Sequence, residues 1–462
     1  MGTRAYGDTR EIFTVAVLRD RADWCQKEGG TVSSAYWKQP ISEQATAVHE
    51  KVVSAEVLAQ QVREEIVRTD ADLRAWVGLS PAVVDDARRQ DSMPGRRPLR
   101  GVSLGVKDLI DVSGLPTRAG STITSSFPVS SDAPCVSRFR NLGAVVQGKT
   151  VTTEFGYFSP GPTRNPHQHE HTPGGSSSGS AAAVGAGVIP MALGTQTAGS
   201  LTRPAAYCGA AGLVLAHGST DLSGVTGLSE SLDSLGILTR DIADLQYVYS
   251  AFSGRSPMVP GRSTVRTVVV WGGSDLHPIH PAMSELINRL PGLLGGAGVE
   301  TRALEYDDHV RTLADDHGTV MSHEAAGTLD GVVREHGTAL SPQLRELVDA
   351  GRAVGVDEHA AALIRRDRSR DLLAEALGDH TVIVGPAAPG PAPHGLAATG
   401  SPVLSRPWQL LGCPVVVVPG ATTDAGMPLG LQVIGLPGRE SALFEVAAVL
   451  ETELRSHPVV PA

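Results

Sequence analysis

The chain has little cysteine and no long apolar run. Its four cysteines, Cys25, Cys135, Cys208 and Cys413, are scattered, and none belongs to a C-x-x-C pair. This spacing argues against a zinc site or a redox motif, and unpaired thiols are typical of a reducing compartment. The first residues mix acids with arginines, unlike a secretory or transit peptide, and no stretch approaches the about 20 apolar residues of a membrane-spanning helix. The composition therefore predicts a cytoplasmic protein without a membrane partner.

Lysine is scarce as well, and acidic residues outnumber basic ones. The 49 Asp and Glu residues exceed the 39 Lys and Arg residues, giving a formal net charge of -10. Such a charge repels phosphate backbones, so we expect no nucleic-acid partner. Only five positions carry lysine: Lys27, Lys38, Lys51, Lys107 and Lys149. A chain that otherwise uses arginine has reason to keep a lysine where a titratable amine is needed.

Helical and strand patterns alternate from Ser54 onward. Ser54 precedes apolar positions with helical spacing, which predicts a capped amphipathic helix, and residues 82–90 indicate a second helix. Short apolar runs such as TVRTVVVW, HTVIVGP and PVVVVPG are typical of buried strands, and the Ala-rich residues 181–189 of a buried helix. Further helices are expected at 278–296, 312–337 and 357–377. The pattern predicts a single large α/β body.

Two sequence motifs match known expressions but lack the expected context. Residues 143–150, GAVVQGKT, fit the Walker A expression, yet their valines favour a strand where the phosphate loop should lie. Residues 175–179, GSSSG, fit a nucleophile elbow centred on Ser177, but a polar segment replaces the apolar strand that should precede it. We therefore interpret residues 143–150 as a strand and disfavour a Ser-His-Asp hydrolase.

Three alternating histidines, His167, His169 and His171, would share one side of an extended backbone. No carboxylate or cysteine stands at ligand spacing from them, so we favour a solvated loop and predict no metal site.

Three further segments belong together: GVSLGVKDLIDVSGLPTRAGS around Lys107, PGGSSSGSAAAVGAG around Ser176, and LGTQTAGSLTRPAAYCG around Ser200. With LGAVVQGKTVTTEFG, SLDSLGILTRDIADL and GMPLGLQVIG, they occur in the order found in the amidase signature family, which the sequence resembles over residues 46–462. Residues 1–45 would then be an N-terminal extension. The resemblance implies a mixed, mostly buried β-sheet covered by helices on both faces.

The resemblance also implies a catalytic triad. In it Lys107 is the base, Ser176 a relay with a cis peptide linkage, and Ser200 the nucleophile. The residue types suit these roles, since a serine hydroxyl needs a base to take its proton, and burial lowers the pKa of a lysine amine. Ser176 can both accept and donate a proton, so it can pass one from Ser200 to Lys107 and return it to a leaving amine.

The turn before the nucleophile would supply the oxyanion hole. The resemblance assigns this role to the backbone amides of Thr197, Ala198, Gly199 and Ser200. Amides fixed in advance stabilise charge that appears only in the tetrahedral state.

The form T-A-G-S-x-x-R-P, together with SRPWQLLGCP, is similar to malonamidase-like members of the family. In these Arg203 would receive a substrate carboxylate, with Ser177 as a second substrate contact. A guanidinium matches a carboxylate in two hydrogen bonds. The alternative is that Arg203 braces the loop against an internal acid such as Asp233.

The sequence thus predicts an amidase that hydrolyses the C–N bond of a small linear carboxamide through an acyl-enzyme, without a cofactor. Two alternatives keep the same triad: an acyltransferase or amide-forming enzyme, and a glutaminase-type subunit of an amidotransferase. A noncatalytic binding protein is disfavoured because all three triad positions are intact. The sequence fixes neither the substrate nor the oligomeric state, and a homodimer is compatible with it.

Overall fold

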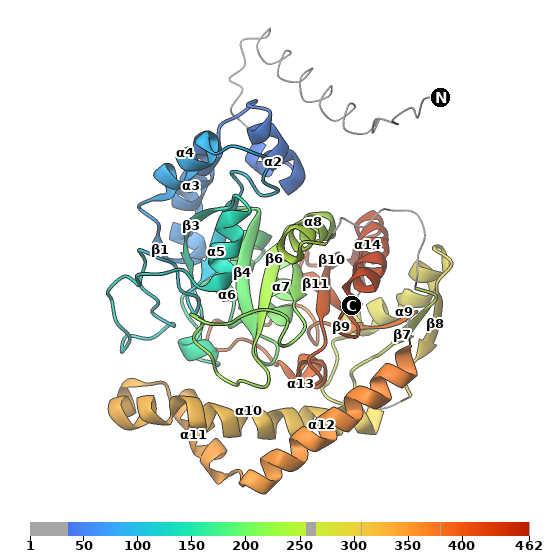
Figure 1. The fold of residues 1–462 in the computed structure, drawn as a ribbon. Coiled ribbons are helices and arrows are strands. Elements are labelled where there is room, and N and C mark those ends of the chain that lie inside the picture. Colours follow the sequence, from blue (N-terminus) through green and yellow to red (C-terminus); the bar gives the residue numbers. More distant parts are fainter. Residues whose placement is uncertain (1–35, 256–264, 306, 379, 462) are drawn as a thin grey trace, which may run out of the picture.

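The computed structural model describes residues 36–255, 265–305, 307–378 and 380–461. These residues form a sheet of twelve strands with helices on both faces (Figure 1). The strands are β1 (Trp76–Leu79), β2 (Ser103–Lys107), β3 (Val145–Thr150), β4 (Met191–Gln196), β5 (Ala211–Val214), β6 (Ser234–Thr239), β7 (Thr267–Val270), β8 (Glu300–Ala303), β9 (Thr381–Pro386), β10 (Val415–Thr423), β11 (Pro428–Ile434) and β12 (Val459–Val460).

The helices show the same interleaving along the chain. They are α2 (Ile41–His49), α3 (Ala55–Leu73), α4 (Val83–Ser92), α5 (Pro134–Asn141), α6 (Ser178–Gly185), α7 (Thr202–Cys208), α8 (Ile242–Ser253), α9 (Pro281–Gly295), α10 (Asp307–His336), α11 (Pro342–Ala353), α12 (Val356–Leu377), α13 (Arg406–Leu410) and α14 (Glu440–Ser456), with short 3₁₀ turns η1 (Tyr36–Lys38), η2 (Glu154–Gly156), η3 (Gly337–Ala339) and η4 (Val403–Ser405). None of the described helices combines the length and apolar character that crossing a bilayer requires.

The sheet is mixed, as expected. Its strands run in the order β1-β3-β2-β4-β6-β5-β10-β11-β9-β7-β8, with β12 beside β10. Strands β3, β2 and β4 are parallel, as are β9, β7 and β8, while the pairs between β4 and β9 are antiparallel. Side chains of central strands alternate between two buried cores: Val415 and Val417 face one, and Val416 and Val418 the other.

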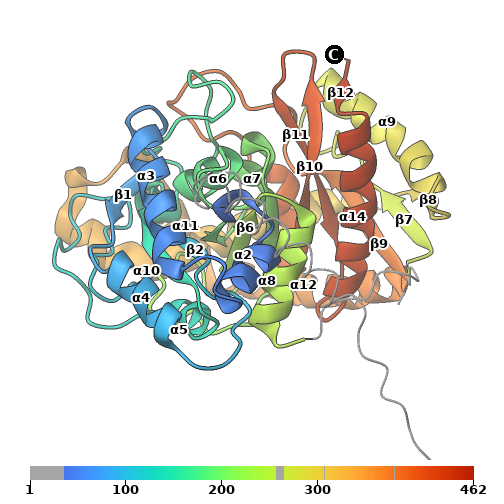
Figure 2. The same cartoon turned by 90° about the horizontal axis from the view of Figure 1, so that it is seen from above.

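Helices cover these two cores separately. The core on one face includes apolar residues of α3, α6, α7 and α10, and the core on the other includes residues of α5, α8, α9 and α14. The view along the other axis shows α14 and α8 on the near side of the sheet (Figure 2). Below the sheet in Figure 1, α10, α11 and α12 form a separate layer across one end of the strands.

This arrangement determines where the three motif segments meet. Strand β2 ends at Lys107, and its parallel neighbour β4 ends at Gln196, directly before the TAGS turn. The carboxyl ends of parallel neighbours lie at one edge of a sheet, where ligands commonly bind in α/β proteins. Helix α6, which begins at Ser178, starts at the same edge because the Gly179 N–H donates to the Val151 carbonyl just after β3 (3.0 Å).

Gly179 is required for that close approach. A Cβ there would lie 2.2 Å from the carbonyl oxygen of Ala75 and 2.4 Å from the amide nitrogen of Val151. The second glycine of GSSSG therefore permits the first turn of α6 to contact the backbone of its neighbours.

Most predicted elements are confirmed. Ser54 caps α3 by accepting the Val57 N–H, and the three apolar runs are β7, β9 and β10. Helix α6 begins and ends earlier than the predicted residues 181–189, and α11 was not predicted. The boundary predicted at residue 46 falls inside α2, whose Ile41 is fully buried with its N–H bonded to Asp244. Residues 1–35 of the predicted extension, including Cys25 and Lys27, lie outside the described residues.

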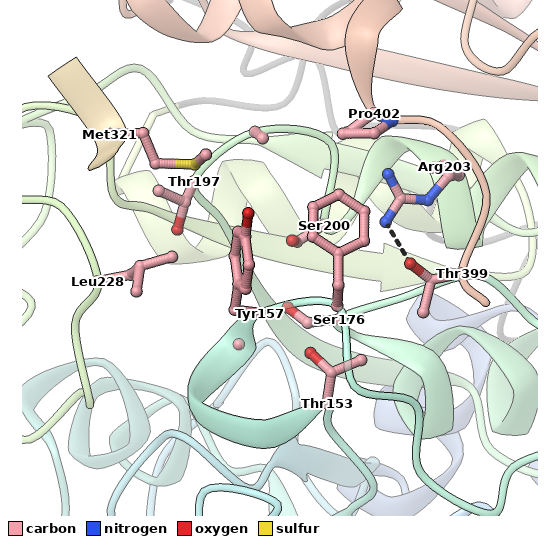
Figure 3. A pocket seen from close by; sticks show the side chains of 13 residues that line it. Thr153, Tyr157, Ser176, Thr197, Ser200, Arg203, Leu228, Met321, Thr399 and Pro402 are labelled. Carbon is pink, nitrogen blue, oxygen red and sulfur yellow. Dashed lines mark hydrogen bonds between the residues drawn. The ribbon is translucent and has the colours of Figure 1, made fainter. Parts of the chain in front are cut away.

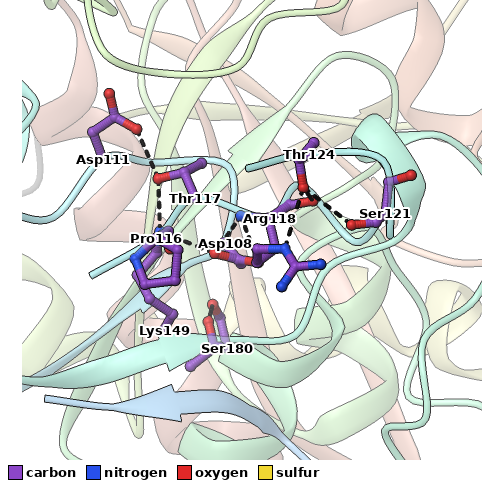
Figure 4. Close-up of polar contacts among 10 residues, drawn as sticks. Asp108, Asp111, Pro116, Thr117, Arg118, Ser121, Thr124, Lys149 and Ser180 are labelled. Carbon is purple, nitrogen blue, oxygen red and sulfur yellow. Dashed lines mark hydrogen bonds and ion pairs between the residues drawn. The ribbon is translucent and has the colours of Figure 1, made fainter. Parts of the chain in front are cut away.

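The Walker A match is a strand, as interpreted from its valines. Residues 145–150 form β3, and Lys149 makes a buried ion pair with Asp108 (3.0 Å) rather than facing a loop. Lys149 also donates to Thr117 Oγ1 (3.0 Å), which in turn donates to Asp111 (2.7 Å), while the Arg118 N–H contacts Asp108 (Figure 4). This cluster adjoins Lys107, the residue before Asp108.

We expect Lys149→Met to lower the free energy of unfolding by about 3–5 kcal/mol, because it leaves the buried Asp108 carboxylate without its cation. Urea unfolding followed by circular dichroism measures the change. Lys51→Met, at an exposed lysine, is the matched control and should shift the free energy by at most about 0.5 kcal/mol. Equal losses in the two variants would contradict the structural role of the ion pair.

Candidate active site

A small pocket opens at the carboxyl end of β2 and β4. It encloses about 320 Å³, including its open mouth, and is lined by Thr153, Gly156, Tyr157, Phe158, Ser176, Thr197, Ala198, Ser200, Arg203, Leu228, Met321, Thr399 and Pro402. Ser200 lies between two sides of the pocket, with Arg203 and Thr399 on one and Leu228 and Met321 on the other (Figure 3). A volume at the lower end of the range for ligand pockets suits a small substrate.

Lys107 reaches this pocket from beneath. Its side chain is 0% exposed, and Nζ lies 2.7 Å from Ser176 Oγ and 2.7 Å from Thr195 Oγ1. Burial holds the pKa of Lys107 well below its ordinary value, although the charge of Asp233 raises it in part. Among the described residues no carboxylate forms an ion pair with Lys107. An amine held neutral in this way accepts the Ser176 hydroxyl proton while donating to Thr195.

Ser176 and Ser200 lie beside each other at the floor of the pocket. The Gly175–Ser176 peptide bond is cis, as the sequence resemblance implied. Ser176 is 3% exposed and Ser200 8% exposed, and both line the pocket. The backbone N–H of Ser177 donates to the Ser200 carbonyl (3.0 Å), which ties the two serine segments together. The structure therefore gathers Lys107, Ser176 and Ser200 from three distant segments.

The turn from Thr197 to Ser200 is held from outside the pocket. Gln196 Oε1 accepts the N–H groups of Leu201 and Thr202, both at 3.0 Å, which fixes the start of α7. Thr197 donates its hydroxyl to Asp233. Within the described ranges, no protein acceptor meets the N–H groups of Ala198, Gly199 and Ser200. These amides are therefore free to receive a ligand oxygen.

Ser177 does not contact substrate, in contrast to the prediction. Its side chain is fully buried outside the pocket, where Oγ donates to the Thr195 carbonyl (3.2 Å) and accepts the Thr195 N–H (3.3 Å). Both bonds hold β4 against the start of α6. This burial also removes the nucleophile-elbow interpretation, which needs an open serine.

Arg203 is a buried cation without an acidic partner. It is 3% exposed, and Nη2 donates to the Gly175 carbonyl and to Thr399 Oγ1 (3.2 Å). Its Nε and Nη1 are buried and find no partner in the described chain. Burial lowers the pKa of Arg203 to about 10, so it remains charged at neutral pH. The predicted alternative of a brace to Asp233 is wrong, because Asp233 accepts the N–H groups of Leu228 and Ser229 instead.

A second arginine strengthens the positive potential near Arg203. Arg406 begins α13, and its Nε is likewise buried without a partner in the described chain. Burial lowers its pKa, and the charge of Arg406 also disfavours the charged form of Arg203. Two uncompensated cations beside one small pocket favour an anionic ligand.

No group of three His, Cys, Asp or Glu residues that could hold a metal ion gathers in the described parts of the chain. Two of the three alternating histidines contact backbone carbonyls: His167 that of Cys208 (3.0 Å) and His171 that of Ala392 (2.7 Å).

Sequence reasoning missed several pocket residues. Thr195, in the segment LGTQTAGS, contacts the amine of Lys107 without having been assigned a role. Tyr157, Leu228 and Met321 line the pocket from segments that carry no chemical motif. His317 of α10 contacts the Thr197 carbonyl (2.8 Å) across 120 residues of sequence.

Known proteins resemble this chain over most of its length. The family model described as Amidase matches residues 58–274. One component of the glutamyl-tRNA(Gln) amidotransferase of Exiguobacterium sibiricum, its A chain, is 30% identical over 464 residues, covering 88% of this chain and 95% of that protein. The AtzE component of the 1-carboxybiuret hydrolase of Pseudomonas sp. is 31% identical over 453 residues, covering 87% and 96%. Peptide amidase from Stenotrophomonas maltophilia has a similar structure, with a TM-score of 0.77, 26% identity, and coverage of 91% of this chain and 98% of that one.

We expect the reactivity of Ser200 to depend on the protonation of Lys107. Below the pKa of Lys107 the amine carries a proton and accepts none, so labelling of Ser200 by a fluorophosphonate should slow as pH falls through that pKa and level off above it. Because burial lowers this pKa, the inflection should lie well below 10.5. Labelling rates from pH 5 to 10 measure it, with Lys107→Arg, which stays protonated, about 10²–10⁴-fold slower. An inflection near 10.5 would contradict a neutral amine.

Proposed function

Because the chain belongs to the amidase signature family, we propose that it is a hydrolase that cleaves the C–N bond of a small carboxamide carrying a carboxylate. The observation that carries this proposal is the fully buried Lys107 amine, 2.7 Å from Ser176 Oγ, beneath a pocket that also contains Ser200. A buried lysine without an ion-pair partner in the described chain is costly to retain and suits a proton acceptor.

The reaction would begin when Ser200 Oγ attacks the carbonyl carbon. The Ser200 proton passes to Ser176, whose own proton moves to Lys107. The carbonyl oxygen, now negative, accepts hydrogen bonds from the backbone amides of the Thr197–Ser200 turn, predicted to be the oxyanion hole. The C–N bond then breaks, and Ser176 returns a proton to the leaving ammonia or amine.

A water molecule completes the cycle. It loses a proton through the same two side chains, Ser176 and Lys107, as its oxygen bonds to the acyl carbon. The Ser200 ester breaks, Ser200 regains its proton, and the carboxylic acid leaves. The net reaction is amide plus water to acid plus ammonia or amine, and this chain's own side chains carry each proton transfer.

Arg203 supports the carboxylate on the substrate. Its unpartnered Nε and Nη1 offer two donors in one plane, the arrangement that a carboxylate accepts. Arg406 adds a second positive charge nearby. The name of one similar protein, 1-carboxybiuret hydrolase, includes a carboxyl group in its substrate, and the malonamidase-like motif form around Arg203 agrees with this proposal.

The similar proteins favour a second candidate, an amidase that works as one subunit among partner chains. By their names, both sequence relatives are subunits of larger enzymes. A glutaminase-type subunit would need its partner and ATP for coupled turnover, whereas ammonia release by the purified chain alone supports the hydrolase. An acyltransferase would instead yield a new amide when a competing amine is added. Product analysis with and without that amine separates these outcomes.

We expect a fluorophosphonate to add one group to the intact chain, and peptide mapping to place it on Ser200. Ser200→Ala should abolish both the labelling and amide hydrolysis, the latter by about 10⁴-fold or more, since it removes the nucleophile. Ser177→Ala is the matched control, because Ser177 lies outside the pocket, and it should still be labelled. A label on Ser177 in the wild type would restore the elbow mechanism.

We expect Arg203→Leu to impair malonamate hydrolysis far more than hydrolysis of a neutral amide such as propionamide. Loss of a buried charge-assisted pair with the substrate costs about 2–5 kcal/mol, so kcat/KM for malonamate should fall about 30-fold or more. Steady-state ammonia release measures both substrates. Losses of the same size on both would count against carboxylate recognition by Arg203.

A further inference from the structure

Helix α10 holds the pocket from the layer below the sheet. Its residues His317, Met321 and Glu324 recur at spacings of four and three, so they lie on one face of the helix. Met321 lines the pocket, and Glu324 accepts the Ser229 hydroxyl (2.6 Å) and the Ser231 N–H (2.9 Å) of the loop that follows Leu228. This face therefore contacts several parts of the pocket wall.

His317 makes the contact nearest to the reacting atoms. Its side chain is fully buried, and Nε2 lies 2.8 Å from the Thr197 carbonyl oxygen. A carbonyl oxygen only accepts, so Nε2 carries the proton and donates. Burial and the charge of Arg406 lower the pKa of His317 to about 3, which keeps the ring neutral and leaves Nδ1 without a hydrogen. His317 thus offers a single N–H, directed at Thr197.

The peptide bond between Thr197 and Ala198 transmits that contact to the pocket. A trans peptide is planar, with its carbonyl and its N–H pointing in opposite directions. A donor on the Thr197 oxygen therefore fixes the plane and turns the Ala198 N–H away from α10. A carbonyl that accepts a hydrogen bond also makes the N–H of the same peptide a stronger donor. Ala198 lines the pocket, and its N–H meets no acceptor in the described chain.

We propose that His317 is a positioning residue that orients and polarises the Ala198 N–H as an oxyanion donor. This inference rests on the proposed function, since the oxyanion forms only if Ser200 attacks a carbonyl. It assigns to α10, which lies beyond the segment matched by the family model, a part in the chemistry as well as in the pocket wall.

A purely structural role would make His317 one of the groups that dock α10. Docking has other supports. Asp316, the residue before it, pairs with Arg365 of α12 (2.5 Å) away from the pocket. If docking were the function of His317, breaking the Asp316–Arg365 pair should have a similar effect on turnover. If His317 acts through the Ala198 N–H, the two changes should differ.

The experiment compares His317→Gln, His317→Asn and Arg365→Gln in the full chain. The amide nitrogen of Gln reaches the position of Nε2, whereas that of Asn ends near Nδ1 and is too short. We expect His317→Asn to lower both kcat and the fluorophosphonate labelling rate of Ser200 about 10–100-fold, a partial loss of one oxyanion donor, with KM nearly unchanged. His317→Gln should recover most of that loss, and Arg365→Gln should behave like the wild type.

The readouts separate the possible failures. Rates are given per mole of chain that unfolds cooperatively, and if His317→Asn does not fold, His317→Met replaces it as the variant without a donor. Equal rates for His317→Gln and the variant without a donor, an effect on KM alone, or an equal loss in Arg365→Gln would overturn the role of His317. A wild type whose Ser200 neither reacts with the fluorophosphonate nor supports ammonia release would overturn the proposed function instead.

Discussion

An amine kept out of water is the constraint on which the site depends. Lys107 ends a buried strand, and its neighbours are hydroxyl and carbonyl oxygens rather than carboxylates. An ion pair would hold the amine charged and remove its basicity, so the nearby acids are engaged elsewhere: Asp108 with Lys149, and Asp233 with Thr197. The surrounding fold keeps the charge of Lys107 uncompensated and thereby keeps its lone pair available.

The sequence predicted what depends on local pattern and on contiguous motifs. The Ser54 cap and the valine-rich strands follow from short-range rules, and the GSSSG and TAGS segments contain most of the groups that meet Lys107. The chain order of these motifs matched the order expected of the family. Parallel pairing of β2 with β4 then brought them to one edge of the sheet.

What the sequence could not predict depends on contacts between distant segments. Nothing in the spacing of residues 307–336 indicates that one histidine reaches Thr197, because that contact requires the whole α10 layer to be placed. Ser177 and Ser176 look alike in sequence, yet one turns into the core and the other into the pocket. The choice of partner for Arg203 was also undecidable, since Asp233 was near enough in sequence to be a candidate and its actual bonds were not visible.

The separate layer formed by α10, α11 and α12 has an evolutionary consequence. The reacting groups come from strands and turns of the segment that the family model matches, whereas Met321 comes from a helix beyond it. Substitutions along one outer helix can therefore reshape what the enzyme accepts while the proton route stays intact. Such a division lets a lineage acquire new nitrogen sources by altering a peripheral element, without rebuilding the catalytic apparatus.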